Sequence, residues 1–379
     1  MQIGKVALRY PMLALFAVCA AMSAGCHGHG AYAPLNEQKI YVSDKFYDLA
    51  IRGDKEALVV GYAGKILRTK DFGFTWEQIE SGTSDALYNI DFAKDDPQTG
   101  WIVGQEGLIL KTTDGGSTWT KQDAQAWMGD DCRDDSYRSR NEEKCSQAYL
   151  FSVSVVDHNT VVAIGDRSTF VYSSDGGRTW RVSTVKSAAQ LANANDEFAI
   201  VFEDPVLYDL TFSDANTGFV VGEFGKIFKT TDAGKTWKEK QDSLIGAEIV
   251  DPLDLPTLFD VSFDGKGDAM AVGLDGRIAV SSDKGDTWKF TPNNVADFTD
   301  PMYAATYLPN GTRWVVGAAG QVVTAQPGQG FQRGSLGSAI NSWIRRIRFS
   351  DDQHGWLVGG FGLIMNTDDG GKTWYRRIG

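Results

Sequence analysis

The feature that most constrains the fold is a short motif that occurs six times along the chain. It reads Ser/Thr-x-Asp-x-Gly-x-Thr-Trp, and its copies span Thr69–Trp76, Thr112–Trp119, Ser173–Trp180, Thr230–Trp237, Ser281–Trp288 and Thr367–Trp374. The shortest interval between copies is 43 residues, and the longer ones indicate insertions into the same unit. The last interval is twice as long, and Phe331 stands at its midpoint in a worn copy without the aspartate. The sequence therefore predicts seven units.

Each unit carries the same strand pattern before the motif. In the second unit, a first strand at 87–92 is followed by a second at 100–104, a Gly-x-x-Gly turn and a third strand at 108–112. A fourth strand starts at Trp119. Seven such units predict an all-β fold, a seven-bladed β-propeller of four-stranded blades. A solenoid is the alternative, but it would leave two exposed edges that need caps.

The repeated motif, an Asp-box, is interpreted as structural. A short carboxylate in a tight turn accepts hydrogen bonds from the backbone of its own turn, and the glycine supplies a positive φ. The tryptophan is expected to pack against a neighbouring blade. A catalytic or calcium-binding role is the alternative, but a single active site does not need six copies. The residues concerned are Asp71, Asp114, Asp175, Asp232, Asp283 and Asp369 with Trp76, Trp119, Trp180, Trp237, Trp288 and Trp374.

The first 26 residues differ from the rest and are typical of a secretory signal. Lys5 and Arg9 precede an apolar run, which is too short to span a bilayer, and small residues lead to Cys26. The segment resembles a bacterial lipoprotein signal with Cys26 as the lipidated residue, although Ser23 departs from that pattern. Plain cleavage and a retained signal are the alternatives. We expect a signal at 1–26, a tether and N-terminal strand at 27–43, and the propeller at 44–379 of an exported, periplasmic, membrane-anchored lipoprotein.

Two cysteines outside the signal, Cys132 and Cys145, predict a disulfide, because such bonds persist in exported proteins. A metal site is the alternative, but no histidine or second cysteine pair lies beside them. The formal net charge of −12 argues against nucleic acid as a partner. The sequence shows no P-loop, dinucleotide fingerprint or nucleophile elbow, so we expect no cofactor and no metal.

One stretch carries a family resemblance. Phe349-Ser-Asp-Asp-Gln-His-Gly-Trp-Leu-Val-Gly359, continuing through Thr367–Trp374, resembles the Ycf48/HCF136-like family of BNR-type propellers, and the resemblance extends over about residues 40 to 379. The founding members are assembly factors for photosystem II reaction centres, and non-photosynthetic bacteria carry exported relatives. The resemblance implies a monomeric, non-enzymatic scaffold that binds a membrane or envelope protein and assists its assembly or function.

Two other classes of function stay open. Asp-boxes also occur in sialidases, which makes a glycan-active hydrolase an alternative. Those enzymes have six blades and an N-terminal Phe/Tyr-Arg-Ile/Leu-Pro motif, which is missing before Thr69. The third possibility is a propeller that binds a small ligand.

The partner is expected on one face of the propeller. The long insertions at 123–148, 183–206, 239–256, 290–301 and 332–342 all connect a fourth strand to the next blade, so they emerge on the face opposite the Asp-boxes. The Gly-x-x-Gly turns emerge on the same face, around the axial opening. The predicted partner-binding residues in these turns are Tyr62, Glu106, Asp166, Arg167, Glu223, Phe224, Asp275 and Phe361.

The first strand of the seventh unit breaks the pattern with Arg345, Arg346 and Arg348. In the family, a basic patch is associated with binding the client, so these arginines are candidate partner-binding residues by resemblance. The structural alternative is that Arg346 or Arg348 pairs with Asp48 across the junction between the seventh and first blades.

Overall fold

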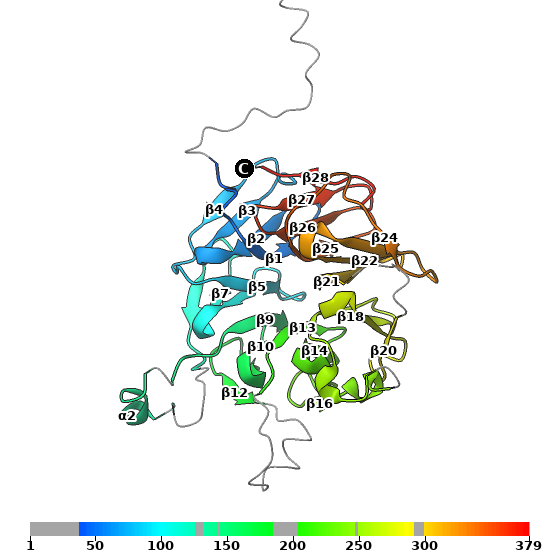
Figure 1. Cartoon of the computed structure of the whole chain (residues 1–379). Coiled ribbons are helices and arrows are strands. Elements are labelled where there is room, and N and C mark those ends of the chain that lie inside the picture. Colours follow the sequence, from blue (N-terminus) through cyan, green and yellow to red (C-terminus); the bar gives the residue numbers. More distant parts are fainter. Residues whose placement is uncertain are drawn as a thin grey trace, which may run out of the picture. The chain divides into compact units, whose positions relative to one another are not determined.

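Seven four-stranded antiparallel sheets follow one another along the chain, and each is built from four consecutive strands. The computed structural model describes residues 38–125, 132, 134–142, 145–184, 204–246, 249–291 and 299–378. Figure 1 shows the sheets as blades around a central axis, with the first strand of each blade innermost. The predicted seven-bladed propeller of four-stranded blades is confirmed.

The strands have nearly the same lengths in every blade. The innermost strands are β1 (Phe46–Ile51), β5 (Leu87–Phe92), β9 (Leu150–Val155), β13 (Leu207–Phe212), β17 (Leu258–Phe263), β21 (Met302–Tyr307) and β25 (Ile344–Phe349). The second strands are β2 (Ala57–Gly61), β6 (Gly100–Gly104), β10 (Val161–Gly165), β14 (Gly218–Gly222), β18 (Ala269–Gly273), β22 (Arg313–Gly317) and β26 (Gly355–Gly359).

The outer half of each blade is shorter. The third strands are β3 (Ile66–Thr69), β7 (Ile109–Thr112), β11 (Thr169–Ser173), β15 (Ile227–Thr230), β19 (Ile278–Ser281), β23 (Val322–Ala325) and β27 (Ile364–Thr367). The outermost strands are β4 (Glu77–Ile79), β8 (Thr120–Gln122), β12 (Arg181–Thr184), β16 (Lys238–Glu239), β20 (Lys289–Phe290), β24 (Gln332–Arg333) and β28 (Tyr375–Arg376). The sixth blade, β21–β24, is the unit without an Asp-box.

The hydrophobic core lies between blades. Each of seven clusters of buried apolar residues joins two neighbouring blades, and one of them joins the last blade to the first. In that cluster, Trp356 and Ile364 of the seventh blade pack with Phe46 and Trp76 of the first. Each sheet contains only strands that are consecutive in sequence, so side-chain packing between the terminal blades, and not a shared sheet, closes the ring.

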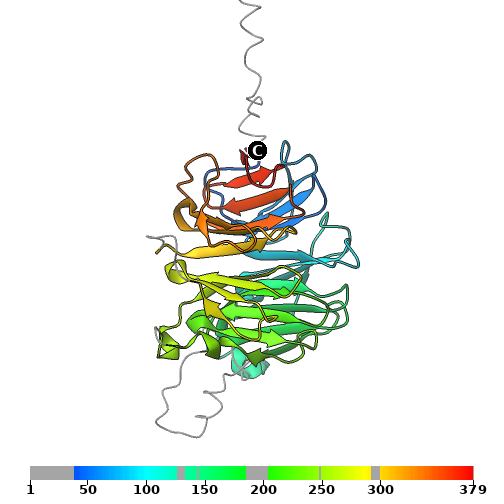
Figure 2. The ribbon, with the colours of Figure 1, turned by 90° about the vertical axis from the view of Figure 1, so that its right-hand side faces the viewer.

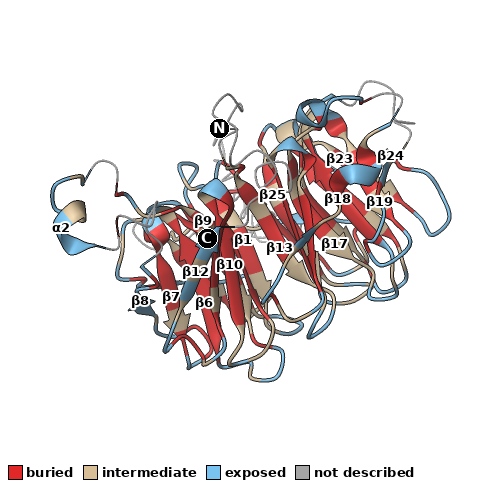
Figure 3. Cartoon of the chain, turned by 90° about the horizontal axis from the view of Figure 1, so that it is seen from below, coloured by how far each residue is buried: buried red, intermediate tan, exposed pale blue. Residues whose placement is uncertain are grey.

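The two faces of the propeller have different turns (Figure 2). The turns between second and third strands and the links between blades emerge on one face, which we call the rim face. The Asp-box turns and the turns between first and second strands emerge on the other, which we call the Asp-box face. Figure 3 shows buried residues along the strands and exposed residues in the turns at both ends.

A β-bulge lies in the innermost pair of strands in all seven blades. The pairing register shifts between the first and third residues of the innermost strand, as between Phe46 and Asp48 in β1. A bulge interrupts the alternation of side chains between the two faces of a sheet. The first and fourth residues, such as Leu87 and Ile90 of β5, consequently lie in the same cluster between blades. The second and third residues of each innermost strand therefore lie toward the axis of the propeller.

Candidate functional site: the propeller axis and its mouth

The Asp-boxes satisfy their own polar groups. In the first blade, Asp71 Oδ1 accepts hydrogen bonds from the Thr69 hydroxyl and the Thr75 N–H, both at 2.9 Å, and Asp71 Oδ2 accepts one from the Thr75 hydroxyl at 2.7 Å. Thr69 Oγ1 in turn accepts the Gly73 N–H at 2.8 Å. The other five boxes repeat this arrangement. Hydrogen bonds from the Thr179 hydroxyl and N–H lower the pKa of Asp175 to about 2.

The Asp-box tryptophans pack toward the preceding blade. Trp237 of the fourth blade lies 5.2 Å from Phe170 of the third, and Trp374 of the seventh lies 5.6 Å from Trp314 of the sixth, as ring centroids. Trp76 of the first blade makes the corresponding contact with Trp356 of the seventh, at 6.1 Å. Both halves of the motif therefore stabilise the scaffold.

The third residue of the inner strand ties each blade to the next. Its side chain accepts the backbone N–H of the fourth residue in the following inner strand. The bonds run from Ile90 to Asp48 at 3.0 Å, Val153 to Asn89 at 3.0 Å, Leu210 to Ser152 at 3.1 Å, Val261 to Asp209 at 3.2 Å and Ala305 to Asp260 at 2.8 Å. The series ends at the sixth and seventh blades, because the side chains of Ala304 and Arg346 contain no hydrogen-bond acceptor.

Arg346 crosses the axis and binds the carboxylates of this layer. Its Nη1 donates to Asp260, its Nη2 donates to Asp209 Oδ1 at 3.1 Å, and its Nε lies 3.0 Å from Asp48 Oδ1. The Nε contact is an ion pair without hydrogen-bond geometry. Arg346 is 6% exposed, and Asp48 is fully buried. Arg346 therefore pairs with Asp48 across the junction between the seventh and first blades, as the structural alternative predicts. It also binds carboxylates of the fourth and fifth blades.

The pKa values of the acidic and the basic side of this ion cluster are both raised. Burial, opposed by the attraction of Arg346 and assisted by the repulsion of Asp209, raises the pKa of Asp260 to about 7. For Arg346, burial lowers the pKa, but Asp260, Asp209 and Asp48 outweigh burial, so that its pKa is raised above the ordinary value. The guanidinium therefore stays charged. Arg348 joins the cluster from the edge, with Nη2 at 3.2 Å from both Asp48 oxygens and its side chain 38% exposed.

A cavity of about 690 Å³ opens below the ion cluster, toward the Asp-box face. Its wall contains the fifth residues of successive inner strands, among them Asp91, Ser154, Thr211, Ser262 and Arg348. Turn residues such as Lys94 and Asp264 surround its opening. This cavity cannot be predicted from the sequence, because the fifth residues vary in type from blade to blade.

Above the ion cluster, toward the rim face, the second residues of six inner strands form a continuous aromatic ring. Tyr47, Tyr88, Phe151, Tyr208, Phe259 and Tyr303 follow one another with centroid separations of 5.4, 5.2, 5.7, 5.2 and 5.4 Å. Arg345 takes the seventh position and donates from Nη1 to the Tyr303 carbonyl at 3.1 Å. Trp343 stacks on Tyr47 at 5.9 Å. All seven ring positions are half-buried.

The predicted rim residues occupy two kinds of position in the Gly-x-x-Gly turns. Tyr62, Asp166 and Glu223 are the first residues of their turns. Glu106, Arg167, Phe224, Asp275 and Phe361 are the middle residues, each with φ between 50° and 56°. The carboxylates of Asp166 and Glu223 bend back toward the inner strands, where they accept the N–H groups of Tyr149 at 3.1 Å and Val206 at 2.9 Å.

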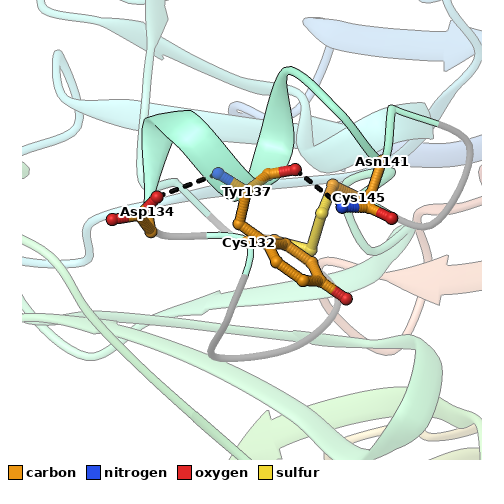
Figure 4. Close-up of a disulfide and its surroundings, with 5 residues drawn as sticks. All are labelled: Cys132, Asp134, Tyr137, Asn141 and Cys145. Atoms are coloured by element: carbon orange, nitrogen blue, oxygen red, sulfur yellow. Dashed lines mark hydrogen bonds between the residues drawn. A yellow bond between two sulfur atoms is a disulfide. The ribbon is translucent and has the colours of Figure 1, made fainter.

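The first long link contains the predicted disulfide (Figure 4). Cys132 and Cys145 are bonded, with Cα atoms 5.4 Å apart and both side chains buried. Between them, Asp134 caps the short helix α2 (Asp135–Arg138) by accepting the Tyr137 N–H at 2.9 Å. The Asn141 carbonyl accepts the Cys145 N–H at 3.0 Å. Of the other predicted sites, Cys26 and the signal lie outside the described residues.

The described part of the chain contains no group of three or more His, Cys, Asp or Glu residues arranged to hold a metal ion. In the same ranges, no helix has the length and apolar character to cross a membrane.

The chain matches the family described as photosynthesis system II assembly factor YCF48 over residues 29–129, 75–145 and 333–378. It is 26% identical over 181 residues to the photosystem II assembly lipoprotein Ycf48 of Picosynechococcus, covering 45% of this chain and 48% of that protein. It is 24% identical over 273 residues to the chloroplastic photosystem II stability/assembly factor HCF136 of Arabidopsis thaliana, covering 56% of this chain and 63% of that one. The chain thus spans about half to two thirds of the length of these curated relatives.

Solved structures show the same fold. The structure described as YCF48 bound to D1 peptide superposes with a TM-score of 0.62 at 18% identity, covering 90% of this chain and 99% of that one. A GH74 xyloglucanase from Xanthomonas campestris gives 0.63 at 11% identity, covering 89% of this chain but 55% of the enzyme. At such identities the structural likeness concerns the fold alone, and the sequence matches carry the assignment. Together with the repeat, they show that the chain is similar to the Ycf48/HCF136-like family of propellers.

Proposed function

We propose that this protein is a non-enzymatic scaffold that binds a membrane or envelope protein through its rim face and assists the assembly of that protein. One observation carries the proposal. Of the ten large apolar side chains that are exposed in the described residues, seven lie on the rim face or in the links beside it: Tyr41, Val42, Tyr62, Phe224, Val250, Leu253 and Phe361. Exposed apolar side chains that gather on one face are typical of protein-binding surfaces.

The arrangement of the chain also supports the rim face as the binding surface. The links between blades, including the disulfide-bonded one, emerge there, and loops that project from one side of a rigid scaffold commonly carry function. The opposite face repeats the self-satisfied Asp-box turn in six blades. The relatives support the type of partner, because they are named as assembly factors for photosystem II, and one solved relative is described as bound to D1 peptide.

A membrane location fits this function. Two relatives are named lipoproteins, and the segment that ends at Cys26 resembles a lipoprotein signal. We therefore include export and lipidation of Cys26 in the proposal. Labelling with a radioactive fatty acid should mark the wild-type protein and not Cys26→Ala. A protein that stays unlabelled but is still exported would favour plain cleavage.

Site-specific cross-linking in intact cells tests the binding face. A photoreactive phenylalanine analogue replaces Phe224 or Phe361 on the rim face, and Phe74 serves as the matched control because it is 71% exposed on the Asp-box face. We expect the two rim positions to cross-link to the same membrane or envelope protein, and the control position to give none of it. Equal cross-linking from both faces, or products without any membrane or envelope protein, would contradict the proposal.

The cavity supports one alternative, a propeller that binds a small ligand. A volume of about 690 Å³ lies within the usual range of ligand pockets, and its wall offers hydroxyl groups and both charges. Thermal-shift screening of polar metabolites should then raise the melting temperature with some compound, and Thr211→Val should abolish that rise.

A further inference from the structure

We propose that the mouth of the axis on the rim face binds a lysine or arginine side chain of the partner. Its cation would lie between Asp166 and Glu223 and against the rings of Tyr88, Phe151 and Tyr208. This inference rests on the proposed binding of a protein at the rim face, and it specifies which side chain of that protein the mouth would recognise.

The two carboxylates belong to neighbouring blades and are fixed in place. Asp166 Oδ2 accepts the Tyr149 N–H at 3.1 Å, and Glu223 Oε2 accepts the Val206 N–H at 2.9 Å. Among the described residues, neither carboxylate forms an ion pair with a lysine, arginine or histidine. The remaining carboxylate oxygens are therefore available to an incoming cation.

The aromatic ring supplies the rest of the site. Phe151 lies between Tyr88, at 5.2 Å, and Tyr208, at 5.7 Å, and the three rings are tilted against one another. Tyr149 adds a fourth ring at 6.4 Å from Phe151. Aromatic faces attract cations, and cages of several rings are a common way to bind an ammonium group. The long apolar stem of lysine or arginine also suits a channel lined by such rings.

The electrostatic field at this part of the ring is negative. Burial raises the pKa of Asp166 and Glu223 adds to the shift, and together they outweigh the Tyr149 N–H and the neighbouring Arg167, which lower it. Burial also raises the pKa of Tyr208, with further contributions from Glu223 and Asp166. The pKa of Tyr88 is raised to about 12 by burial, with Tyr47, Tyr149 and Asp166 acting in the same direction. The raised pKa values of Asp166, Tyr88 and Tyr208 show that this place resists further negative charge, which favours a cation.

The one cation in the ring does not cancel this field. Arg345 belongs to the seventh blade, which lies across the ring from the third and fourth blades. Burial and Arg346 lower its pKa, while the attraction of Asp260 and Asp209 opposes them, so its charge is compensated by the acidic layer below. An acidic side chain would therefore be repelled at Asp166 and Glu223. An apolar one would bury both carboxylates without a partner, which is costly.

Fluorescence anisotropy with short labelled peptides tests the inference. The probe has three lysines separated by glycines, and companion probes replace lysine by norleucine or by trimethyl-lysine. We expect the lysine and trimethyl-lysine probes to bind and the norleucine probe not to bind. The double variant Asp166→Asn with Glu223→Gln should bind the lysine probe at least about tenfold more weakly, since two charged contacts are lost.

A matched variant controls for the overall acidity of the protein. Glu106→Gln with Asp275→Asn removes the same charge from two exposed rim positions that lie outside the proposed site. It should weaken binding less than threefold. Equal weakening by both double variants would mean general attraction to an acidic surface and would overturn the inference, as would equal binding of the norleucine probe.

Phe151→Ala gives a second measurement that changes no charge. It should weaken binding of the trimethyl-lysine probe at least about fivefold, because this cation depends on the rings. Unchanged affinity would exclude the aromatic cage. Circular dichroism melting confirms that each variant is folded. If the rim face cross-links to a membrane protein but the lysine probe does not bind, this inference is wrong and the proposed function stands. If the lysine probe binds but no membrane or envelope protein is cross-linked, the proposed function is wrong and the cation site stands.

Discussion

The Asp-box aspartates and the inner-strand aspartates use the same side chain in opposite ways. Each Asp-box carboxylate is at least partly exposed, and hydrogen bonds from its own turn keep it charged, so its pKa is lowered. The carboxylates of Asp48, Asp209 and Asp260 are buried, bind backbone groups of the next blade and share one arginine. Burial raises the pKa of Asp260.

The difference shows how a repeat separates local from global stabilisation. An Asp-box contains its hydrogen-bond partners within one turn, so losing one box affects one blade. The inner layer connects different blades, and Arg346 joins the first, fourth, fifth and seventh blades at the axis. A change there is expected to affect the whole ring, because a buried charge without its partner is strongly destabilising.

Replacing Arg346 by methionine should have the largest effect. The variant keeps the apolar bulk but leaves the buried carboxylates of Asp209 and Asp260 without their cation, and Asp48 with Arg348 alone. We expect the free energy of unfolding to fall by about 3–5 kcal/mol, and the melting temperature to fall by roughly 10 °C. Calorimetry of the purified propeller measures both. Arg167→Met, on the exposed rim, is the control and should change the melting temperature by less than about 2 °C. An unchanged melting temperature for Arg346→Met would show that the cluster contributes no stability.

The pH dependence of Asp260 should have an intermediate effect. Its pKa in the folded protein, about 7, lies above that of the unfolded chain. Its stabilising contribution is therefore complete below the unfolded pKa and is lost as the pH rises through 7. The wild type should lose up to about 1.4 kcal/mol for each pH unit between 5 and 7 relative to Asp260→Asn, which does not titrate.

Urea unfolding of both proteins at pH 5, 6 and 7 gives this difference directly. If the wild type instead gained stability over Asp260→Asn as the pH rose, Asp260 would be ionised throughout and Arg346 would dominate its pKa.

Replacing Asp114 by alanine should have the smallest effect. Although burial raises its pKa, the Thr118 hydroxyl and N–H outweigh burial and lower the pKa to about 2. Stability from this carboxylate is present above the unfolded pKa and is lost as the pH falls through about 2. At pH 7 we expect a loss of about 1 kcal/mol, because the exposed turn can bind water instead. The difference from the wild type should shrink at pH 2, opposite in sign to the behaviour of Asp260. A loss as large as that of Arg346→Met would remove the distinction between the two kinds of aspartate.

One part of the axial lining, the aromatic ring, has a signal in the sequence. The second residues of the first strands are aromatic in six of seven units, and this periodicity is visible in the printed chain. Simple alternation, however, would place Tyr88 and Ile90 on the same side of β5. The bulge moves Ile90 into the core with Leu87 and leaves Tyr88 in the ring. Nothing in the local sequence marks the bulge, so the aromatic ring was missed.

The repeat, the four strands of each blade and the structural role of the Asp-box can be predicted from the sequence alone, because each depends on residues close together in the chain. The partners of Arg346 are different: the sequence suggests Asp48 as a partner, but it does not indicate Asp209 or Asp260. Those residues lie in blades that are adjacent to Arg346 only across the axis. Only closure of the ring brings a buried cation and three buried carboxylates together, since their attraction depends on a low dielectric that no isolated blade provides.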